Sequence, residues 1–529
     1  MPRNLCLAGE ASSVAAALTT LKCRCAELGL RLSTGEAHFK DKCELVLVGG
    51  QASTVNVGQF PSDFKVIREG NFELLGGPVG DQEFCNEHTQ ARVTKACGVL
   101  EALGELPDPQ VALQLLRHCA GFSKMVFSIR AVPSAFHANA LRSFDDHVRR
   151  TFEQFSCLHP DNEQWSQATL STNSGGLGLR SLAQHSHAAF LASRSSRMEL
   201  CHQLDPNHLF ESPAGADLAP ESVAFREYNR SVNDDDRLPP VSEKLSQKVL
   251  SQGVEKRVLA QLRHDACQSR RDHLDLLCKG SGSHWHAPPS KAAGLSVEPS
   301  LFVGMLRRWL RVRFSETDIE CPLCDGMLDG FGDHALVCCA GGDRTRRHNL
   351  LRNMVFHAAE AANLRPELEK PGLLPQRPLL DSTYENGGSF SEQDSTPGAR
   401  RPADVYIPRW RLGPPAAWDF AVTSGLRLGL HADAANPDGV TSRYEDIKSS
   451  HQDTRAECLA QGFTFIPMVV EAVGGGWGKM ARCVWSELAK KYVLASGELA
   501  TEDTSATMLL QRLSMTLHRE NVRACLRRF

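Results

Sequence analysis

Residues 320–342 bring together side chains that bind transition metals. The stretch ECPLCDGMLDGFGDHALVCCAGG contains Cys321 and Cys324 as a C-x2-C pair, then His334, then the adjacent Cys338 and Cys339. Two thiolates, an imidazole and a third thiolate in one short loop suit a closed tetrahedral zinc site. We expect Cys338 as the fourth ligand because it follows His334 with the compact H-x3-C spacing, and Cys339 stays open as the alternative. Chance grouping of free thiols in a chain with 18 cysteines is the competing interpretation.

A basic segment follows directly. GGDRTRRHNLLRNMVFHAAEAANL places basic side chains at the start of a predicted helix, namely Arg344, Arg346, Arg347, His348 and Arg352. The phosphate backbone of a nucleic acid would be a natural partner for the arginines of such a cluster. The alternative is a solvated helix face.

Two carboxylates occur on short apolar runs further along the chain. In RRPADVYIPRWRLGPPAAWDFAVTSG, Asp404 opens one run and Asp419 lies inside the next. Unpaired charge on buried strands is costly. A magnesium ion held by hard oxygen ligands at neighbouring strand ends would compensate the charge and could serve phosphodiester cleavage. Lys448, four residues after Tyr444 on one helical face, could hold the attacking water, whereas solvated acidic strand ends are the simpler interpretation.

The surrounding segments predict how these residues are positioned. The pattern alternates helix and strand, which favours an α/β sheet flanked by helices. The expected elements are a helix (346–363), two strands (403–408 and 416–422), a helix (443–461), a strand (463–470) and a helix (478–494).

The rest of the chain is predicted to be mostly helical up to about residue 200, with a helix starting at Asp108-Pro109. Segments rich in Pro, Asp, Ser and Gly predict a linker at 205–245, a second linker around SHWHAPP and an insertion at 379–401. His284 and His286 in SHWHAPP give only a weak metal signal.

Composition excludes several classes of protein. The net charge of −3 and the pI near 6.7 give no global signal for nucleic acid, so any basic surface must be local. No run approaches 18 apolar residues, and the N-terminus does not follow the pattern of a secretory signal. Cysteines scattered singly on apolar faces indicate reduced thiols and an intracellular protein, nuclear or cytoplasmic.

The order of the motifs resembles a known family. The Cys/His loop, RRHN, RPAD and WDFAV resemble the C-terminal region of non-LTR retrotransposon proteins of the restriction-like endonuclease class. That family carries a Cys-Cys-His-Cys motif followed by a PD-(D/E)xK-type nuclease. The resemblance implies that Asp404 and Asp419 bind Mg²⁺, that Lys448 is the downstream lysine, and that the cysteines and histidine hold a structural zinc.

The chain departs from the family pattern in three places. Ala403 is inserted between Pro402 and Asp404, and Ala421 stands two residues after the second acid where a lysine is usual. An upstream helper glutamate is often present in this superfamily, and either Glu360 or Glu369 could serve.

The N-terminal third resembles the palm end and thumb of the same polyproteins, as in ELLGGPVG and SGGLGLRSLAQHSHAAFLAS. The Tyr/Phe-x-Asp-Asp hairpin of reverse transcriptases is missing from the sequence, and the chain looks as if it begins just after it. Asp145 and Asp146 belong to an amphipathic helix instead, and the NDDDR run lies in the predicted linker. We therefore expect no polymerase activity.

These observations predict an α+β, multi-domain protein. The expected parts are a thumb-like remnant (1–204), a linker with short helices (205–297), a helix with the zinc knuckle (298–345), a restriction-like endonuclease domain with an α/β core (346–500) and a helical tail (501–529).

The expected function is that of a retroelement-derived, magnesium-dependent DNA endonuclease. The partners implied are DNA, the element's RNA and a polymerase supplied in trans, and no membrane. The alternative is a catalytically inactive remnant that binds zinc and nucleic acid. A purely structural protein is a third option, and it would contain no zinc.

Overall fold

The computed structural model describes most of the chain. The described residues are 6–30, 43–48, 54–62, 64–68, 70–204, 219–239, 245–278, 282–375, 402–411, 413–427, 434–436, 438–496 and 504–529. The expected insertion at 379–401 and residues 205–218 and 240–244 of the expected linker at 205–245 lie outside them.

Helices dominate the described residues, and the sheets are small. The α-helices are α1 (Ala11–Glu27), α2 (Gln82–Gly104), α3 (Pro109–Leu115), α4 (Phe122–Ala131), α5 (Ala138–Ser156), α6 (Asn162–Thr169), α7 (Leu182–Ser195), α8 (Met198–Leu204), α9 (Pro220–Arg230), α10 (Gln247–Asp265), α11 (Gln268–Leu277), α12 (Pro299–Leu310), α13 (Asp333–Val337), α14 (Asp343–Ala361), α16 (Gly439–Ser450), α17 (Thr454–Ala460), α18 (Lys479–Ser496) and α19 (Thr504–Leu526). The strands are β1 (Glu44–Val46), β2 (Lys65–Ile67), β3 (Phe72–Leu74), β4 (Gly77–Val79), β5 (Ile319–Glu320), β6 (Met327–Leu328), β7 (Glu367–Leu368), β8 (Val405–Ile407), β9 (Ala416–Thr423) and β10 (Thr464–Glu471).

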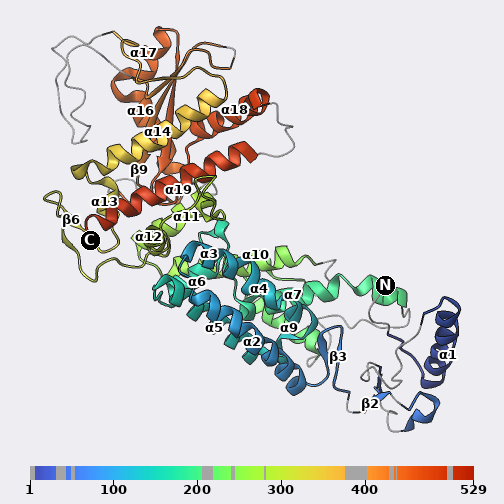
Figure 1. The fold of residues 1–529 in the computed structure, drawn as a ribbon. Helices are drawn as coiled ribbons and strands as arrows, with labels where there is room; N and C mark the ends of the chain where they lie inside the picture. The colour runs from blue at the N-terminus through green and yellow to red at the C-terminus, as the bar shows by residue number, and fades with distance from the viewer. Residues whose placement is uncertain are drawn as a thin grey trace. The chain divides into compact units, whose positions relative to one another are not determined.

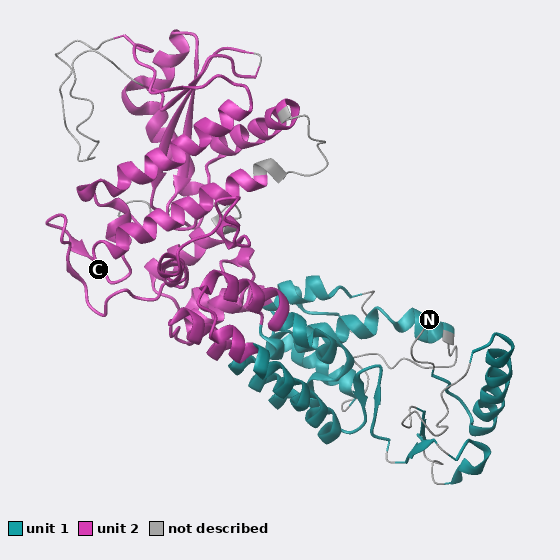
Figure 2. Ribbon diagram, in the orientation of Figure 1, with its two compact units in different colours: residues 1–99, 122–147, 181–254 teal, residues 100–121, 148–180, 255–529 magenta. Residues whose placement is uncertain are grey.

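The chain forms two compact units. Unit 1 comprises residues 1–99, 122–147 and 181–254, and unit 2 comprises residues 100–121, 148–180 and 255–529 (Figure 2). The expected blocks 1–204 and 205–297 are each divided between the two units. Packing therefore does not follow these sequence-based boundaries.

Unit 1 is built mainly from helices. Its core contains Phe190 and Leu191 of α7, Tyr228 of α9 and Leu250 of α10, and α4 packs on α7. The strand pairs β1–β2 and β3–β4 are only three residues long. Among the described residues of this unit, helix packing therefore provides the core.

Asp145 caps a helix of unit 1. It lies in α5, and its carboxylate accepts hydrogen bonds from Ser181 Oγ (2.7 Å), Leu182 N (2.8 Å) and Ala183 N (3.1 Å) at the start of α7. Burial raises the pKa of Asp145 to about 6. The acid therefore stabilises a helix N-terminus, as expected for a residue outside a polymerase hairpin.

The largest sheet lies in unit 2. Its strand order is β10-β9-β8-β7, with β9 and β10 parallel and the other two pairs antiparallel. β8 begins one residue after Asp404, and its first residue, Val405, pairs with Trp418 of β9. The long apolar strands β9 and β10 are buried along most of their length, as is typical of a sheet covered on both faces.

Helices cover this sheet on two sides (Figure 1). One hydrophobic cluster joins Trp418 and Phe420 of β9 to residues of α14, α18 and α19, such as Val355, Trp485 and Leu517. A second cluster joins Ala417 of the same strand to Cys458 of α17 and to Phe463 and Phe465 at β10. Because side chains alternate along a strand, Asp419 lies on the Ala417 side, where α16 also packs against β9 and β10.

Two expected peripheral segments belong to the core of unit 2. Helix α19, predicted as a tail, contributes Leu513 and Leu517 to the sheet cluster and packs on α12, α13, α14 and α18. Trp285, predicted to lie in a flexible linker, is fully buried and stacks on His286, with ring centroids 4.1 Å apart. The sequence pattern missed the burial of Trp285 because a single apolar residue in a Gly-rich stretch shows no periodicity. For α19 it predicted the helix, but a helical pattern does not tell on which elements the helix packs.

The expected elements around the aspartates agree with the observed ones. Strands β8, β9 and β10 and helices α14 and α18 start and end within three residues of the prediction. The expected helix 443–461 is divided into α16 and α17 by a short turn at His451–Asp453, where Gln452 has a φ of 51°. No helix among the described residues is both long and apolar enough to span a membrane.

Candidate functional site

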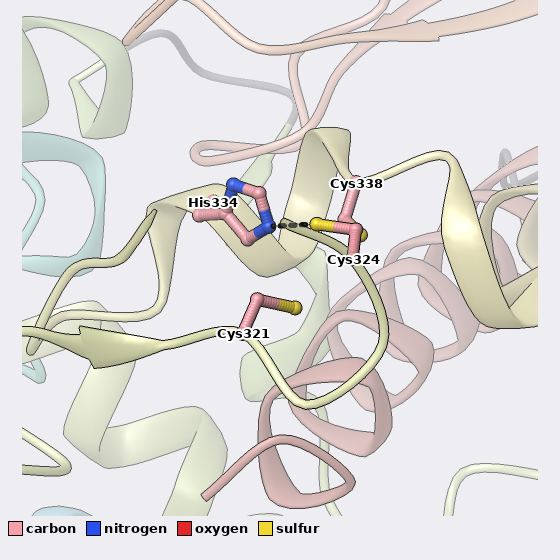
Figure 3. Close-up of side chains that lie close together, drawn as sticks. All are labelled: Cys321, Cys324, His334 and Cys338. Atoms are coloured by element: carbon pink, nitrogen blue, oxygen red, sulfur yellow. Dashed lines mark hydrogen bonds between the residues drawn. The ribbon is translucent and has the colours of Figure 1, made fainter. Parts of the chain in front are cut away.

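The side chains of Cys321, Cys324, His334 and Cys338 point toward one another (Figure 3). Their ligand atoms all lie within 4.8 Å of one another, with 3.3 Å between Cys324 Sγ and His334 Nε2 and 3.6 Å between Cys324 Sγ and Cys338 Sγ. Tetrahedral zinc with bonds of about 2.3 Å separates its sulfur ligands by about 3.8 Å. The four residues, called the Cys/His cluster below, can therefore hold a metal ion and are compatible with zinc.

Local structure positions these ligands. Cys321 follows β5, and its N–H donates to Gly326 O (2.9 Å) in the turn between β5 and β6. Glycine is needed at 326, since a Cβ there would lie 2.8 Å from His334 Cε1. Asp329 accepts from His334 N (2.8 Å) at the start of α13, and Cys338 directly follows that helix.

The structure resolves the choice between the adjacent cysteines. Cys338 is buried within the Cys/His cluster, whereas Cys339 is exposed and its sulfur lies 2.9 Å from Nη1 of Arg344. Hydrogen bonds from Leu323 N and from His334 outweigh burial and lower the pKa of Cys321 to about 6. A low thiol pKa favours the thiolate that binds zinc.

The two predicted aspartates meet in unit 2. Lys448 Nζ lies 2.9 Å from Asp419 Oδ2, and His348 Nε2 lies 3.1 Å from Asp404 Oδ2. All four side chains are largely buried, with 19–27% of each exposed. We call them the Asp–Lys–His cluster.

Four elements supply this cluster. Asp404 directly precedes β8. Its Oδ2 accepts a hydrogen bond from Phe420 N (2.6 Å), so that β9 is hydrogen-bonded to this segment also just before the first residue of β8. Asp419 lies within β9, Lys448 in the last turn of α16, and His348 in the second turn of α14. The sequence-based prediction of Asp404, Asp419 and Lys448 as neighbours therefore agrees with the arrangement in the structure.

Each acid of the cluster has a basic partner. Burial raises the pKa of Asp419, and Asp404 adds to this effect against the opposing charge of Lys448. Burial would also raise the pKa of Asp404, but His348 and the Phe420 N–H outweigh it and lower that pKa. Burial alone would lower the pKa of Lys448 and of His348, yet their aspartate partners raise both. With both aspartates ionised and with Lys448 and His348 protonated, the net charge of the cluster is close to zero.

Each aspartate also keeps one carboxylate oxygen out of these contacts. The bonds from His348 and Phe420 both reach Oδ2 of Asp404, and Lys448 reaches Oδ2 of Asp419. In the part of the chain that the structure describes, no hydrogen bond reaches either Oδ1. Carboxylate oxygens are the preferred ligands of Mg²⁺, so the donor set fits a hard divalent cation.

The expected phosphate-binding arginines differ in their surroundings. Arg347 is buried and donates to Asn521 Oδ1 (2.6 Å) and to Leu336 O (2.9 Å). Arg352 is buried and pairs with Glu369. Neither side chain lies on the surface, which corrects the prediction that they contact phosphate. The helical face of Arg347 packs on α13 and α19, and this could not be read from a run of basic residues.

The other two arginines are accessible. Arg346 is 54% exposed and pairs with the buried Glu520 (2.9 Å), and Arg344 lies against Cys339. Only these two of the four proposed contacts remain available to a phosphate backbone.

The structure separates the two candidate helper glutamates. Glu360 pairs with His357 in the last turns of α14, about 18 Å along the helix from His348 at 1.5 Å per residue. Glu369 pairs with Arg352, one turn from His348, and its N–H donates to Asp404 O (3.1 Å). Of the two, Glu369 is the one beside the Asp–Lys–His cluster.

His348 is the member of the cluster that sequence reasoning missed. It was grouped with the arginines as one more basic residue. Its spacing of four residues from Arg352 places both on one helical face, which was the available signal. That face lies toward Asp404 and Glu369.

Neither the known protein-family models nor the curated proteins match this chain.

Proposed function

We propose that this chain is a metal-dependent DNA endonuclease whose reaction centre is the Asp–Lys–His cluster. The observation that carries the proposal is the meeting of Asp404, Asp419 and Lys448 from three separate elements, with one free oxygen on each acid. An ion pair that only stabilised the fold would need one aspartate beside Lys448 and not two. Two carboxylates beside a lysine are the donor set that phosphodiester cleavage uses.

The residues take distinct roles in this proposal. Asp404 and Asp419 would hold Mg²⁺ through their free oxygens, and the ion would supply a Lewis acid and a lower pKa for a bound water. Lys448 stays protonated beside Asp419 and places positive charge where negative charge develops on the phosphate. His348 orients Asp404, and the N–H of Glu369, the residue after β7, donates to the backbone carbonyl of Asp404.

Two further features support a nucleic-acid substrate. The Cys/His cluster, with zinc as its structural metal, directly precedes α14. The first turn of that helix carries the partly exposed Arg344, which lies against Cys339, and the exposed Arg346. The order of the cluster, RRHN, RPAD and WDFAV is similar to that of non-LTR retrotransposon proteins. We therefore propose that the chain has a retroelement origin and a PD-(D/E)xK-like core in residues 346–500. Its N-terminal part would be thumb-like and without polymerase activity. The target would be DNA in the nucleus or cytoplasm.

One observation favours a second candidate, a catalytically inactive remnant that binds zinc and nucleic acid. Each aspartate already has a basic partner in the Asp–Lys–His cluster, so the fold needs no divalent cation to neutralise them. Ion pairs of this kind also persist in proteins without activity.

Nicking of supercoiled plasmid DNA separates the two candidates. The purified full chain would be assayed with Mg²⁺ and with Mn²⁺, alongside Asp404→Asn, Asp419→Asn and the control Asp446→Asn, an exposed acid on the same helix as Lys448. We expect each cluster variant to lose at least about 100-fold in nicking rate, because carboxylate ligands of a catalytic metal are lost, and the control to keep full activity. Nicking that is unchanged in Asp404→Asn would overturn the assignment, and no nicking with either metal would favour the inactive remnant.

A further inference from the structure

Three arginines surround one buried acid where α14 packs on α19. The acid is Glu520 of α19, with only 2% of its side chain exposed. Its carboxylate pairs with the Nε atoms of Arg346 (2.9 Å), Arg519 (3.1 Å) and Arg523 (3.8 Å). Arg346 comes from α14 and the other two come from α19. We call these three residues the arginine triad.

The triad reaches Glu520 with only one side of each guanidinium. Arg346 and Arg519 donate to the carboxylate through Nε, and Nε of Arg523 also faces it. Among the described residues, no hydrogen bond is made by a terminal Nη atom of the triad, and 30–54% of each side chain is exposed. The terminal nitrogens are the planar fork with which arginine binds a phosphate through two parallel hydrogen bonds. Glu520 therefore holds three guanidinium groups in place and leaves their forks to solvent.

Positive charge is in excess around this acid. One buried carboxylate needs one cation, whereas three converge on Glu520. Asp343, three residues before Arg346, is likewise shared by Arg527 and the fully buried Arg528. In these pairs five guanidinium groups face two carboxylates, which leaves an excess of three positive charges. An ion-pair network that only joined α14 to α19 would need no such excess, and the excess favours an anionic partner.

The exposed arginines of α19 form a row. Arg519, Arg523 and Arg527 are four residues apart, and Arg527 N still donates to Arg523 O (3.1 Å) as in a helix. Residues at this spacing lie on one helical face. At 1.5 Å per residue the row is about 12 Å long, and each strand of a DNA duplex carries one phosphate per about 3.4 Å of helix axis. A regular row of cations therefore fits a regular row of phosphates better than it fits the irregular carboxylates of a protein surface.

We propose that the arginine triad, continued along α19 by Arg527, binds the phosphate backbone of DNA, with Glu520 as the residue that positions its guanidinium groups. The proposal rests on the DNA-binding part of the proposed function and requires no cleavage. Only Arg344 and Arg346 of α14 are accessible to a phosphate, so α19 would supply most of the contacts. That helix was expected to be only a tail.

The test measures DNA binding of the full chain over a salt series. Fluorescence anisotropy with a labelled DNA duplex, in the absence of Mg²⁺, would compare wild type with Arg519→Gln and Arg523→Gln. We expect each variant to bind a few-fold more weakly and to lower the slope of log K against log salt by about 0.9, because one phosphate contact is lost. Arg519→Lys and Arg523→Lys should keep the slope and lose less affinity, since lysine keeps the charge without the planar fork.

Arg482→Gln is the matched control. Arg482 lies in α18 of the same unit and is 41% exposed, but both of its terminal nitrogens already donate to Asp438 (2.8 and 2.6 Å). Its replacement removes one positive charge, as the triad variants do, and should leave the slope unchanged. An equal fall of the slope in Arg482→Gln would mean that only the total charge matters, and this result would overturn the proposal.

Three other results would also overturn it. An unchanged slope in both Arg519→Gln and Arg523→Gln, with lower stability in urea, would show that the triad only joins α14 to α19. Polyglutamate that competes as well as unlabelled duplex DNA of equal charge would indicate an acidic protein as the partner. Wild-type protein that binds no DNA would refute the proposal outright.

Folding of the variants is checked by circular dichroism. If a Gln variant does not fold, arginine modification of the wild-type protein by phenylglyoxal replaces it, with mass spectrometry as the readout. Bound DNA should protect the triad, and reactivity that DNA leaves unchanged would overturn the proposal. A wild type that shows the expected slopes but nicks no plasmid would support the proposal and defeat only the nuclease assignment.

Discussion

The two polar clusters of unit 2 differ in how their residues come together. The Cys/His cluster collects its four ligands from residues 321–338, through one hairpin turn and one short helix. The Asp–Lys–His cluster collects its members from residues 348–448, through two helices and the two strands β8 and β9. The first is chemically incomplete without a cation, since three sulfur atoms face one another. The second is complete, because each acid has its own base.

A metal ion would therefore act differently at the Cys/His cluster and at the Asp–Lys–His cluster. A metal in the Cys/His cluster would add to the stability of the fold, because the ligands have no other strong partner there. A cation at the Asp–Lys–His cluster would compete with the charges of Lys448 and His348. We therefore expect tight binding at the first cluster and weak, pH-dependent binding at the second.

The largest expected effect is the loss of zinc in Cys338→Ser. The variant should contain no zinc after purification, where wild type contains one ion per chain, because a structural zinc site contributes on the order of 10 kcal/mol and depends on all its ligands. The paired variant Cys339→Ser should keep its zinc. Elemental analysis of both proteins measures this. If Cys339→Ser loses zinc and Cys338→Ser keeps it, the Cys/His cluster has been assigned to the wrong thiol.

The next effect concerns Lys448→Met, which leaves Asp419 without its base. Burial already raises the pKa of Asp419 above its ordinary 3.8, and the loss of Lys448 raises it further. A carboxyl with a raised pKa destabilises the fold increasingly as pH rises above its unfolded value. We expect Lys448→Met to lower the free energy of unfolding by about 2–3 kcal/mol at pH 8 and by clearly less at pH 5. The loss is smaller than for a fully buried pair because about a fifth of each side chain is exposed.

Urea unfolding at the two pH values measures the cost. The exposed Lys479→Met, in the first turn of α18, is the control and should show no such dependence. A cost for Lys448→Met that is the same at both pH values would mean that the lysine stabilises by packing, not by pairing with Asp419.

A smaller effect is expected for His348→Gln. Asp404 raises the pKa of His348 above its ordinary 6.5 despite burial. The pair therefore adds stability that is complete below pH 6.5 and is lost as pH rises through the raised pKa. Wild type should exceed the variant by about 1–2 kcal/mol at pH 6, and the difference should shrink toward pH 9.

The same helix provides the control for this prediction. His357→Gln changes an exposed histidine that pairs with Glu360, and its stability difference should stay near zero across the range. A pH-independent difference for His348→Gln would show that the imidazole acts as a neutral hydrogen-bond donor, and the two clusters would then differ less in charge than we describe.

The smallest effects are expected for the surface arginines. If Arg344 and Arg346 contact phosphates, replacing either with Gln should weaken DNA binding a few-fold and lower the slope of log K against log salt by about 0.9. Arg347→Gln should leave the slope unchanged and destabilise the fold, because Arg347 is buried against Asn521. Fluorescence anisotropy over a salt series distinguishes the two outcomes, and a lower slope for Arg347→Gln would contradict the burial argument.

Sequence patterns predicted the local elements well. The apolar run around Trp418 and the run after Asp404 became β9 and β8, and the C-x2-C pair with the H-x3-C spacing came together as expected. These succeed because strand and loop conformation depend mainly on neighbouring residues. The prediction failed for Trp285 and for Arg347, whose surroundings come from segments far away in the sequence.

The residue types and spacing alone therefore determined which side chains could bind a metal and on which elements they lie. Only the tertiary structure decided that His348 faces Asp404, that Lys448 reaches Asp419, and that Arg528 pairs with Asp343. The reason is physical: local conformation follows from short-range sterics and hydrogen bonding, whereas the partner of a buried charge depends on which helix packs over it.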